Sequence, residues 1–223
     1  TGDDMKIAVV ACGHDAKDAP YNDPSWQIWS LGRNYVSIPR YDRWFEMHSR
    51  EIVKANSQPC ILKFLDDAGE KLYAGFPEDF KSATPYPLDI CKNYRGYMTS
   101  SVGYMLALAI DANPEEIGLW GVDMTGDSEY TGQRPACEYL LGLAEGKGIK
   151  VTTSPSCPLL KTKRMYAVEY NELSHEVTET LKDLEGAMQE AHKKAIEGEF
   201  FKGQKAGLAT AHEVITRMKR RWG

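Results

Sequence analysis

The stretch Tyr97–Asp123 (YMTSSVGYMLALAIDANPEEIGLWGVD) constrains the fold more than any other part of the sequence. After three hydroxyl residues, Val102–Ala112 is apolar over most of its length and long enough for a helix, which an Asn-Pro pair then ends. Ile117–Trp120 follows as a short buried strand and leads into Gly121. A helix and a strand in direct succession, both largely apolar, predict a buried sheet with helices packed against it.

The ends of these two elements have the chemistry of an anion site. Thr99, Ser100 and Ser101 stand at the expected helix N-terminus, where hydroxyl and unpaired N–H groups can bind a phosphate. Gly121 and Asp123 follow the strand, and open α/β folds bind ligands at the carboxyl ends of their strands. The alternative is an ordinary α/β unit whose hydroxyl residues only cap the helix. This stretch alone does not decide between the two.

The residues before this stretch extend the same pattern. Lys6–Ala11 is a continuous apolar run typical of a strand buried on both faces. Trp26–Leu31, Arg43–His48 and Pro59–Phe64 predict three further strands, and Glu51–Ser57 predicts a short helix. The Lys6–Ala11 strand ends in a turn at Gly13 and the Arg43–His48 strand ends in polar residues, as expected for a sheet whose carboxyl edge carries a ligand site.

The residues that follow complete an α/β domain. Met124–Pro135 predicts a polar loop, Ala136–Lys147 a helix and Ile149–Thr152 another strand. We therefore predict a doubly wound, mostly parallel, Rossmann-like sheet over residues 5–165. The proline-rich segment Tyr73–Asn93 is expected to be irregular, either as a lid over the ligand crevice or as a surface excursion.

From Ala167 onward the pattern changes. Apolar residues between Leu173 and Ala195 alternate spacings of four and three, and a similar seam runs from Leu208 to Trp222. Glu197–Gly203 separates the two seams. We predict a C-terminal helical hairpin over residues 166–223, which either packs on the α/β domain or pairs with a second copy to form a homodimer.

Composition narrows the class of protein. No apolar run approaches 18 residues, so no membrane span is expected, and the acidic, polar start does not predict a signal peptide. The five cysteines are widely spaced and contain no C-x-x-C pair, which favours neither a disulfide framework nor a zinc site. The net charge of −5 argues against broad nonspecific binding of nucleic acids. We expect a cytoplasmic protein.

The segment YMTSSVGYMLALAI…EEIGLWGVDM is similar to an S-G-V-Y-M…L-x-G-I-D-F-Y region found in a known family. By this segment the chain resembles the bacterial sialyltransferases and the related pterin diphosphokinase-like, sialyltransferase-like Rossmann family. KIAVVACGHD matches in position the strand that ends in G-N-G-P-S, and GIKVTTSPSCPLL the strand that ends in P-N-S-P-L. The stretches IWSLGRNYVSIPRYDRWFEMH and YTGQRPACEYLLGLA are also similar to phage-encoded proteins, some of them associated with glycosylation of modified DNA bases. A phage origin would imply the host cell cytoplasm.

The resemblance implies a donor activated as a nucleotide, namely a UDP- or CMP-type nucleotide sugar. Two departures concern the chemistry: the family's Asn after the second strand is here Gly32, and its catalytic histidine would fall near Gln133–Arg134. The resemblance therefore implies a nucleotide-binding scaffold more directly than sialyl transfer. The predicted nucleotide- and phosphate-binding residues are Gly13, His14, Gly32, Thr99, Ser100, Ser101, Gly121, Tyr130, Gln133 and Arg134.

Glycosyl transfer requires a base for the acceptor hydroxyl and groups that stabilise the leaving phosphate. His48, Glu46 and Asp123 are the candidate catalytic residues, and Asp123 can alternatively bind a ribose hydroxyl. No D-x-D pair is present, so no metal is predicted. The basic residues Lys161, Lys163 and Arg164 are candidates for contacts with an acceptor DNA, or else a solvated surface.

Three functions are consistent with these residues. The leading hypothesis is a nucleotide-sugar-dependent glycosyltransferase, with hydroxylated bases of phage DNA as one candidate acceptor. The second is an ATP-dependent diphosphokinase-like enzyme on the same scaffold. The third is a non-catalytic protein that binds or sequesters a nucleotide.

Overall fold

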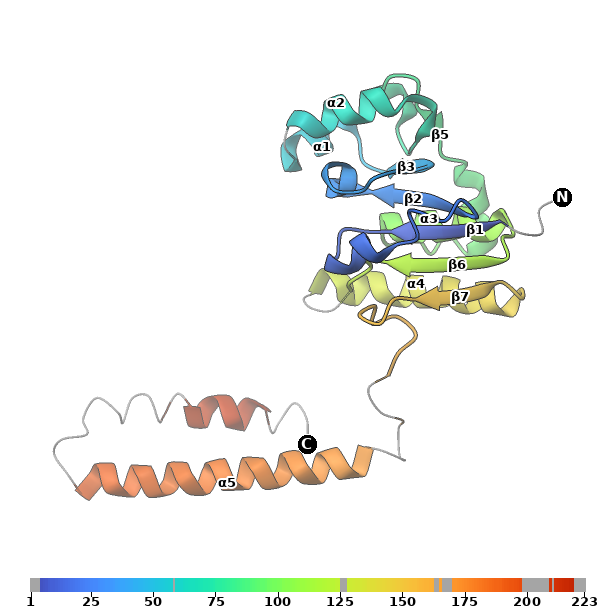
Figure 1. The fold of residues 1–223 in the computed structure, drawn as a ribbon. Helices are drawn as coiled ribbons and strands as arrows, with labels where there is room; N and C mark the ends of the chain where they lie inside the picture. The colour runs from blue at the N-terminus through green and yellow to red at the C-terminus, as the bar shows by residue number, and fades with distance from the viewer. Residues whose placement is uncertain are drawn as a thin grey trace. The chain divides into compact units, whose positions relative to one another are not determined.

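The computed structural model describes residues 5–57, 59–124, 128–162, 165, 170–197, 209 and 211–218. The chain divides into two compact units, Thr1–Lys161 and Thr162–Gly223. The first unit contains the sheet, and the second contains the long C-terminal helix (Figure 1).

The first unit is built on a seven-stranded sheet in the order β5-β4-β3-β2-β1-β6-β7. Every pair of neighbouring strands runs parallel. This confirms the predicted parallel, Rossmann-like α/β fold. The strands are β1 (Lys6–Val10), β2 (Trp26–Leu31), β3 (Arg43–Glu46), β4 (Leu72–Ala74), β5 (Thr84–Pro85), β6 (Glu116–Trp120) and β7 (Lys150–Thr153).

Helices and short 3-10 turns connect the strands. The helices of this unit are α1 (Arg50–Asn56), α2 (Pro59–Ala68), α3 (Ser101–Asp111) and α4 (Ser128–Gly146). The 3-10 turns are η1 (His14–Asp18), η2 (Gly32–Val36), η3 (Gly69–Lys71), η4 (Pro77–Asp79) and η5 (Leu88–Tyr94). Helices α3 and α4 lie together on one face of the sheet (Figure 1).

Strand β1 lies at the centre of the core. Its side chains alternate between two hydrophobic clusters, as successive residues of a strand point to opposite faces. Ile7 and Val9 pack in the cluster that includes α3 and α4. Ala8 and Val10 pack on the other face with Ile28. These four residues are fully buried, which accounts for the continuous apolar run in the sequence.

The predicted strand over Pro59–Phe64 is wrong, because this segment forms the first part of α2. Ile61, Leu65 and Ala68 are buried, and their spacing of four and three places them on one face of a helix. That face packs in a cluster with Trp44 of β3. A six-residue apolar window is compatible with either element, and only the residues beyond Phe64 reveal the helical period.

Two expected loops also differ from the structure. Helix α4 begins at Ser128, so the predicted loop Met124–Pro135 is helical from there onward, and residues 125–127 lie outside the described residues. The segment Tyr73–Asn93 contains β5 and two 3-10 turns in place of a wholly irregular loop. Strand β5 lies at the edge of the sheet, where a proline such as Pro85 is tolerated.

The second unit contains α5 (Tyr170–Glu197) and helical residues at 209 and 211–218. Two apolar residues of the α5 seam, Val177 and Leu184, are exposed. Most of the predicted break at Glu197–Gly203 lies outside the described residues, so the hairpin stays a prediction. Among the described residues, no helix is long and apolar enough to cross a membrane.

Candidate functional site

A cavity of about 630 Å³ lies where the order of the strands reverses. The chain runs from β1 through β2, β3 and β4 to β5 on one side, and then returns to place β6 on the other side of β1. Such a reversal opens a crevice at the carboxyl ends of the two strands that flank it, here β1 and β6, and open α/β folds bind their ligands there.

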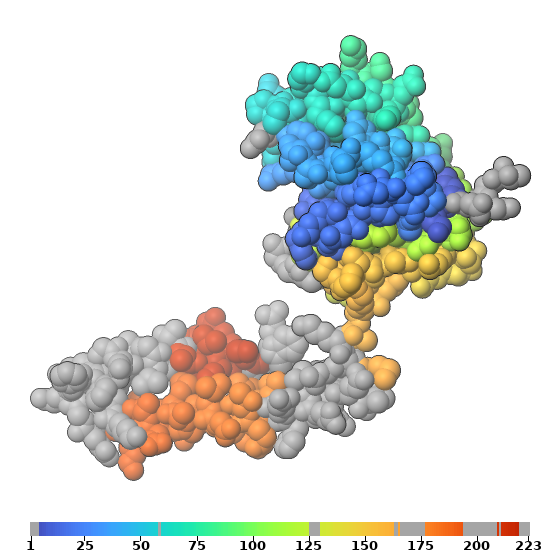
Figure 2. All heavy atoms as spheres, viewed as in Figure 1, coloured from blue at the N-terminus to red at the C-terminus, as the bar shows by residue number. Residues whose placement is uncertain are grey.

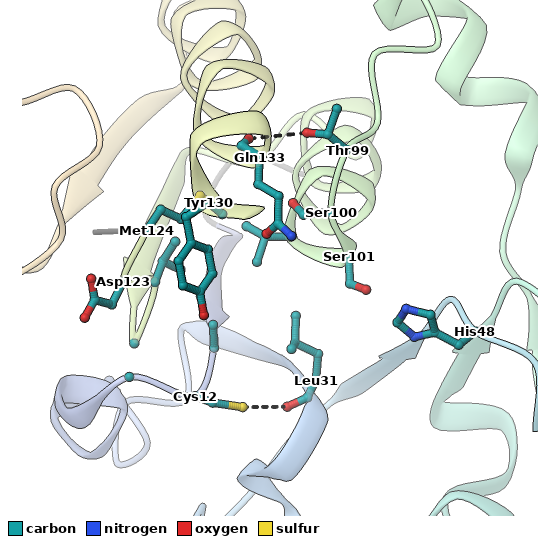
Figure 3. Close-up of a pocket in the computed structure, with 15 residues that line it drawn as sticks. Cys12, Leu31, His48, Thr99, Ser100, Ser101, Asp123, Met124, Tyr130 and Gln133 are labelled. Atoms are coloured by element: carbon teal, nitrogen blue, oxygen red, sulfur yellow. Dashed lines mark hydrogen bonds between the residues drawn. The ribbon is translucent and has the colours of Figure 1, made fainter. Parts of the chain in front are cut away.

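The cavity brings together most of the residues that the sequence predicts for a site (Figure 3). Its lining is Ala11, Cys12, Gly13, Leu31, His48, Thr99, Ser100, Ser101, Val102, Gly121, Val122, Asp123, Met124, Tyr130 and Gln133. Of the predicted site residues, His14, Gly32, Glu46, Arg134 and Lys161 do not belong to this lining. Lys163 and Arg164 lie outside the described residues. No described residue of the segment Tyr73–Asn93 lines the cavity, so its role as a lid gains no support.

The turns after β1 and β6 touch backbone to backbone. The Gly13 N–H donates to the Gly121 carbonyl at 2.8 Å, and the Ala11 N–H donates to the Trp120 carbonyl at 2.8 Å. Gly121 has φ +65°, a conformation that side chains rarely adopt, and a Cβ there would overlap the carbonyl of Ala11. A Cβ on Gly13 would lie only 2.8 Å from the Gly121 oxygen. Because both residues are glycines, the turns after β1 and β6 can pack closely enough to form the floor of the cavity.

Asp15 fixes these turns, although sequence reasoning did not select it as a site residue. Its carboxylate accepts the Gly121 N–H at 2.8 Å and the Ser156 hydroxyl at 2.7 Å, so it joins the segments that follow β1, β6 and β7. The residue is only 7% exposed. Burial alone would raise the pKa of Asp15, but these hydrogen bonds outweigh burial and lower it.

We expect Asp15→Asn to lower the free energy of unfolding by about 1–3 kcal/mol at pH 7, because a buried hydrogen-bonded charge is lost. A carboxyl with a lowered pKa stabilises the fold above its unfolded value near 3.9, and this contribution is lost as pH falls through the folded pKa. Urea unfolding at pH 7 and near pH 3 should show the gap between wild type and variant shrinking. The exposed Asp18 of the same turn supplies the control Asp18→Asn. Equal stability of Asp15→Asn and wild type at pH 7 would disprove the role.

The N-terminus of α3 faces the cavity. Ser100 is the N-cap, and its hydroxyl accepts the Gly103 N–H at 3.2 Å, so this serine does serve as a cap. The Thr99 hydroxyl donates to the Gln133 carbonyl at 3.4 Å. Within the described part of the chain, the N–H groups of Ser101 and Val102 donate no hydrogen bond, and both residues line the cavity. These two N–H groups, the Ser101 hydroxyl and the helix dipole are groups that can bind an anion.

The predicted cation Arg134 lies outside the cavity lining and is engaged elsewhere. Its guanidinium donates to Glu138 at 2.9 Å and to the carbonyl of Pro158 at 2.9 Å. Lys161 likewise donates to the carbonyl of Ser154 at 2.6 Å. Both cations hold the segment after β7. Among the described residues that line the cavity, none is a lysine or an arginine. A phosphate bound there would rely on N–H and hydroxyl donors.

His48 and Glu46 form a hydrogen-bonded pair at the end of β3. The same oxygen of Glu46 accepts the His48 backbone N–H at 3.0 Å and contacts His48 Nδ1 at 2.7 Å. The Glu46 side chain is 9% exposed and that of His48 is 56% exposed. When the carboxylate is ionised, Nδ1 donates to it, and Nε2 is left as the atom that can accept a proton. Glu46 therefore positions His48 without lining the cavity itself.

The opposite wall comes from α4 and the end of β6. In Figure 3 Tyr130 and Gln133 reach from α4 toward the middle of the cavity, across from His48. Asp123 follows β6 on the same side as Tyr130. A phenol, an amide and a carboxylate on one wall can hydrogen-bond the base and the sugar of a nucleoside.

Sequence reasoning missed two groups of residues here. Cys12 and Leu31 line the cavity at the ends of β1 and β2, where the Cys12 thiol lies 3.7 Å from the Leu31 carbonyl oxygen. Asn34 is buried, and its amide donates to the carbonyls of Val10 and Ala11. The position of Cys12 and Leu31 at strand ends was a usable signal. Asn34 offered none, because its partners lie far away in the sequence.

Comparisons with known proteins give a weak likeness. No family model matches the chain, and no curated protein does. The sialyltransferase CstII from Campylobacter jejuni in complex with CMP-3FNeuAc is 14% identical, with 69% of this chain and 81% of that chain covered and a TM-score of 0.41. The sialyltransferase CST-II with a trisaccharide acceptor and CMP is 14% identical, with 69% and 82% covered and a TM-score of 0.40. Similarity at this level does not assign an activity to this chain.

Proposed function

We propose that this protein is a nucleotide-sugar-dependent glycosyltransferase whose donor binds in the cavity at the ends of β1 and β6. The observation that carries the proposal is the pairing, in one cavity, of two N–H groups at the start of α3, which have no partner among the described residues, with a histidine held by a buried carboxylate. The first can bind a leaving phosphate, and the second can remove a proton from an acceptor. The resemblance of Tyr97–Met124 to the sialyltransferases supports the same reaction class.

In the proposed reaction, an acceptor hydroxyl attacks the anomeric carbon of the donor sugar, and the bond from that carbon to the phosphate oxygen breaks. The phosphate keeps the electron pair, and the acceptor proton passes to His48 Nε2. The N–H groups of Ser101 and Val102 and the Ser101 hydroxyl stabilise the negative charge on the leaving nucleotide. Tyr130, Gln133 and Asp123 hold the nucleoside.

The first test is the melting temperature of the protein with CMP, UDP, UDP-glucose, GDP-mannose or ATP and Mg²⁺. A ligand at 100 times its Kd stabilises the fold by about 2.7 kcal/mol, which corresponds to a shift of roughly 5–11 °C for a chain of this size. A shift with a pyrimidine nucleotide supports the proposal. No shift with any nucleotide would refute it.

The same panel separates the two alternative functions. A shift with ATP alone, together with Mg²⁺-dependent turnover of ATP, would favour a diphosphokinase-like enzyme. Tight binding of a nucleotide without turnover of any nucleotide sugar would favour a sequestering protein. Assays with and without EDTA then show whether transfer depends on a divalent ion.

A hydroxylated base in DNA is one proposed acceptor. It rests on the phage resemblance and on the basic residues Lys161, Lys163 and Arg164. Lys161 is already hydrogen-bonded to loop carbonyls, which weakens its claim as a phosphate contact. Replacing all three by alanine should flatten the dependence of DNA binding on salt concentration. An unchanged slope in a salt titration would remove these residues from DNA binding.

A homodimer through the C-terminal helices is a second proposal about partners. Val177 and Leu184 of the α5 seam are 41% and 48% exposed, and a second copy could cover them. Light scattering should then give twice the 25.0 kDa of one chain. Val177→Asp with Leu184→Glu should return the protein to one chain, whereas the exposed control Lys193→Glu should not. A wild-type protein of 25.0 kDa would exclude the dimer.

A further inference from the structure

A second cavity, of about 790 Å³, lies between η2 and the junction of α1 and α2. It shares no lining residue with the first cavity. Turn η2 follows β2 directly, and α1 begins four residues after the end of β3. Both cavities therefore belong to the carboxyl edge of the sheet. Their volumes fall in the range of about 300–1,000 Å³ that is usual for small-molecule sites.

Three polar side chains in this lining have hydrogen-bonding capacity to spare. Within the described part of the chain, the side chain of Arg33 makes neither an ion pair nor a hydrogen bond, and that of Ser57 makes no hydrogen bond. Asn56 donates from its amide nitrogen to the Ile52 carbonyl at 3.0 Å, which leaves its amide oxygen as an acceptor. An arginine fork matches a carboxylate, phosphate or sulfate, and the other two groups suit hydroxyls.

The aromatic wall of this cavity is held in place before any ligand arrives. The Tyr35 ring lies 5.1 Å from the Phe64 ring between centroids. Its hydroxyl contacts the Cys60 sulfur at 2.8 Å. A ligand in this cavity can therefore contact a fixed Tyr35 ring and the Arg33 guanidinium, which both belong to η2. An aromatic wall with a few polar groups is typical of a small-molecule site.

We propose that this second cavity is a separate binding site for a small hydroxylated molecule with one anionic group, which Arg33 holds. A small acid fits better than DNA, because the cavity is concave and its described lining contains one cation, whereas a nucleic-acid backbone is bound by a row of cations. The net charge of −5 also argues against DNA as the ligand.

The test is calorimetric titration of the full chain with glucuronate, glucose-6-phosphate, glucose-6-sulfate and neutral glucose. At least one of the acids should bind at least about ten times more tightly than glucose, as a charge-assisted contact implies. Arg33→Gln should remove this preference without changing the binding of glucose. Lys54→Gln, which removes an exposed charge from the neighbouring α1 without touching the lining, should leave it intact.

Each titration is repeated with the nucleotide that gives the largest thermal shift at saturation. Retained binding of the acid supports a site separate from the first cavity, and displacement of the acid by nucleotide would overturn the proposal. No preference for any of the acids, or an equal loss of preference in Lys54→Gln, would also overturn the proposal but would leave the proposed glycosyl transfer untouched. Arg33-dependent binding of acids without binding of any nucleotide would support this second site and refute the donor site in the first cavity. Arg33-dependent binding of a DNA oligonucleotide in place of the acids would overturn the ligand class.

Discussion

Gly121→Ala is expected to lower the melting temperature of the protein by about 10 °C, through a loss of about 3–4 kcal/mol. The backbone of Gly121 has φ +65°, which strains any residue with a Cβ, and the new methyl group would meet the backbone carbonyl of Ala11. Neither the new methyl group nor the Ala11 carbonyl can move away without separating the ends of the paired strands β1 and β6. Thermal unfolding followed by circular dichroism measures the change.

Gly142→Ala supplies the matched control. Gly142 is exposed in the middle of α4, and a Cβ there has open space around it. Alanine favours a helix more than glycine by up to about 1 kcal/mol, so this variant should match the wild type or exceed it. A Gly121→Ala protein that melts with the wild type would show that the turn after β6 can relax, contrary to the close packing described above.

His48→Ala is expected to reduce the rate constant of sugar transfer by about 100- to 10,000-fold, the usual effect of removing a general base. The thermal shift caused by the nucleotide should stay nearly the same, because the proposed phosphate contacts come from α3. Glu46→Gln should cost less than His48→Ala, because its amide oxygen can still accept the two hydrogen bonds that orient the ring. Steady-state kinetics with the donor identified by thermal shift measures all three enzymes.

His14→Ala is the control for the histidine. His14 is exposed in the turn after β1 and does not line the cavity, so its removal should leave transfer unchanged. A His48→Ala enzyme with full activity would remove His48 from catalysis. Activity lost together with the nucleotide-dependent shift would instead assign His48 to donor binding.

The sequence was sufficient to predict those parts of the fold that depend on neighbouring residues in the chain. The apolar run Lys6–Ala11 predicted β1, and the helix–strand succession in Tyr97–Asp123 predicted α3 and β6. Both strands were recognisable because a buried parallel strand needs side chains that are apolar on both faces. The prediction of a strand over Pro59–Phe64 was wrong because this mostly apolar segment is long enough for a strand. The helical spacing of the buried residues becomes visible only when Leu65 and Ala68 are included.

The site was predictable where residues follow strand ends, as with Gly13, Gly121 and His48, because the topology alone brings strand ends together. The direction of a long charged side chain depends on its tertiary partners. Arg134 turns toward the segment after β7 for that reason, and its sequence position could not reveal it. Asp15 escaped notice because its two partners lie 106 and 141 residues away along the chain.

The long sequence separation between Asp15 and its two partners has a consequence for folding during synthesis on the ribosome. Every residue that lines the first cavity has been synthesised by the time Gln133 is added, but Ser156 is not. Until the last strand of the sheet has emerged, Asp15 lacks one of its two partners, and the segment after β7 does not yet brace the turns that shape the cavity. Binding of a nucleotide is therefore expected to be among the last properties the nascent domain acquires, and it would report completion of the domain as a whole.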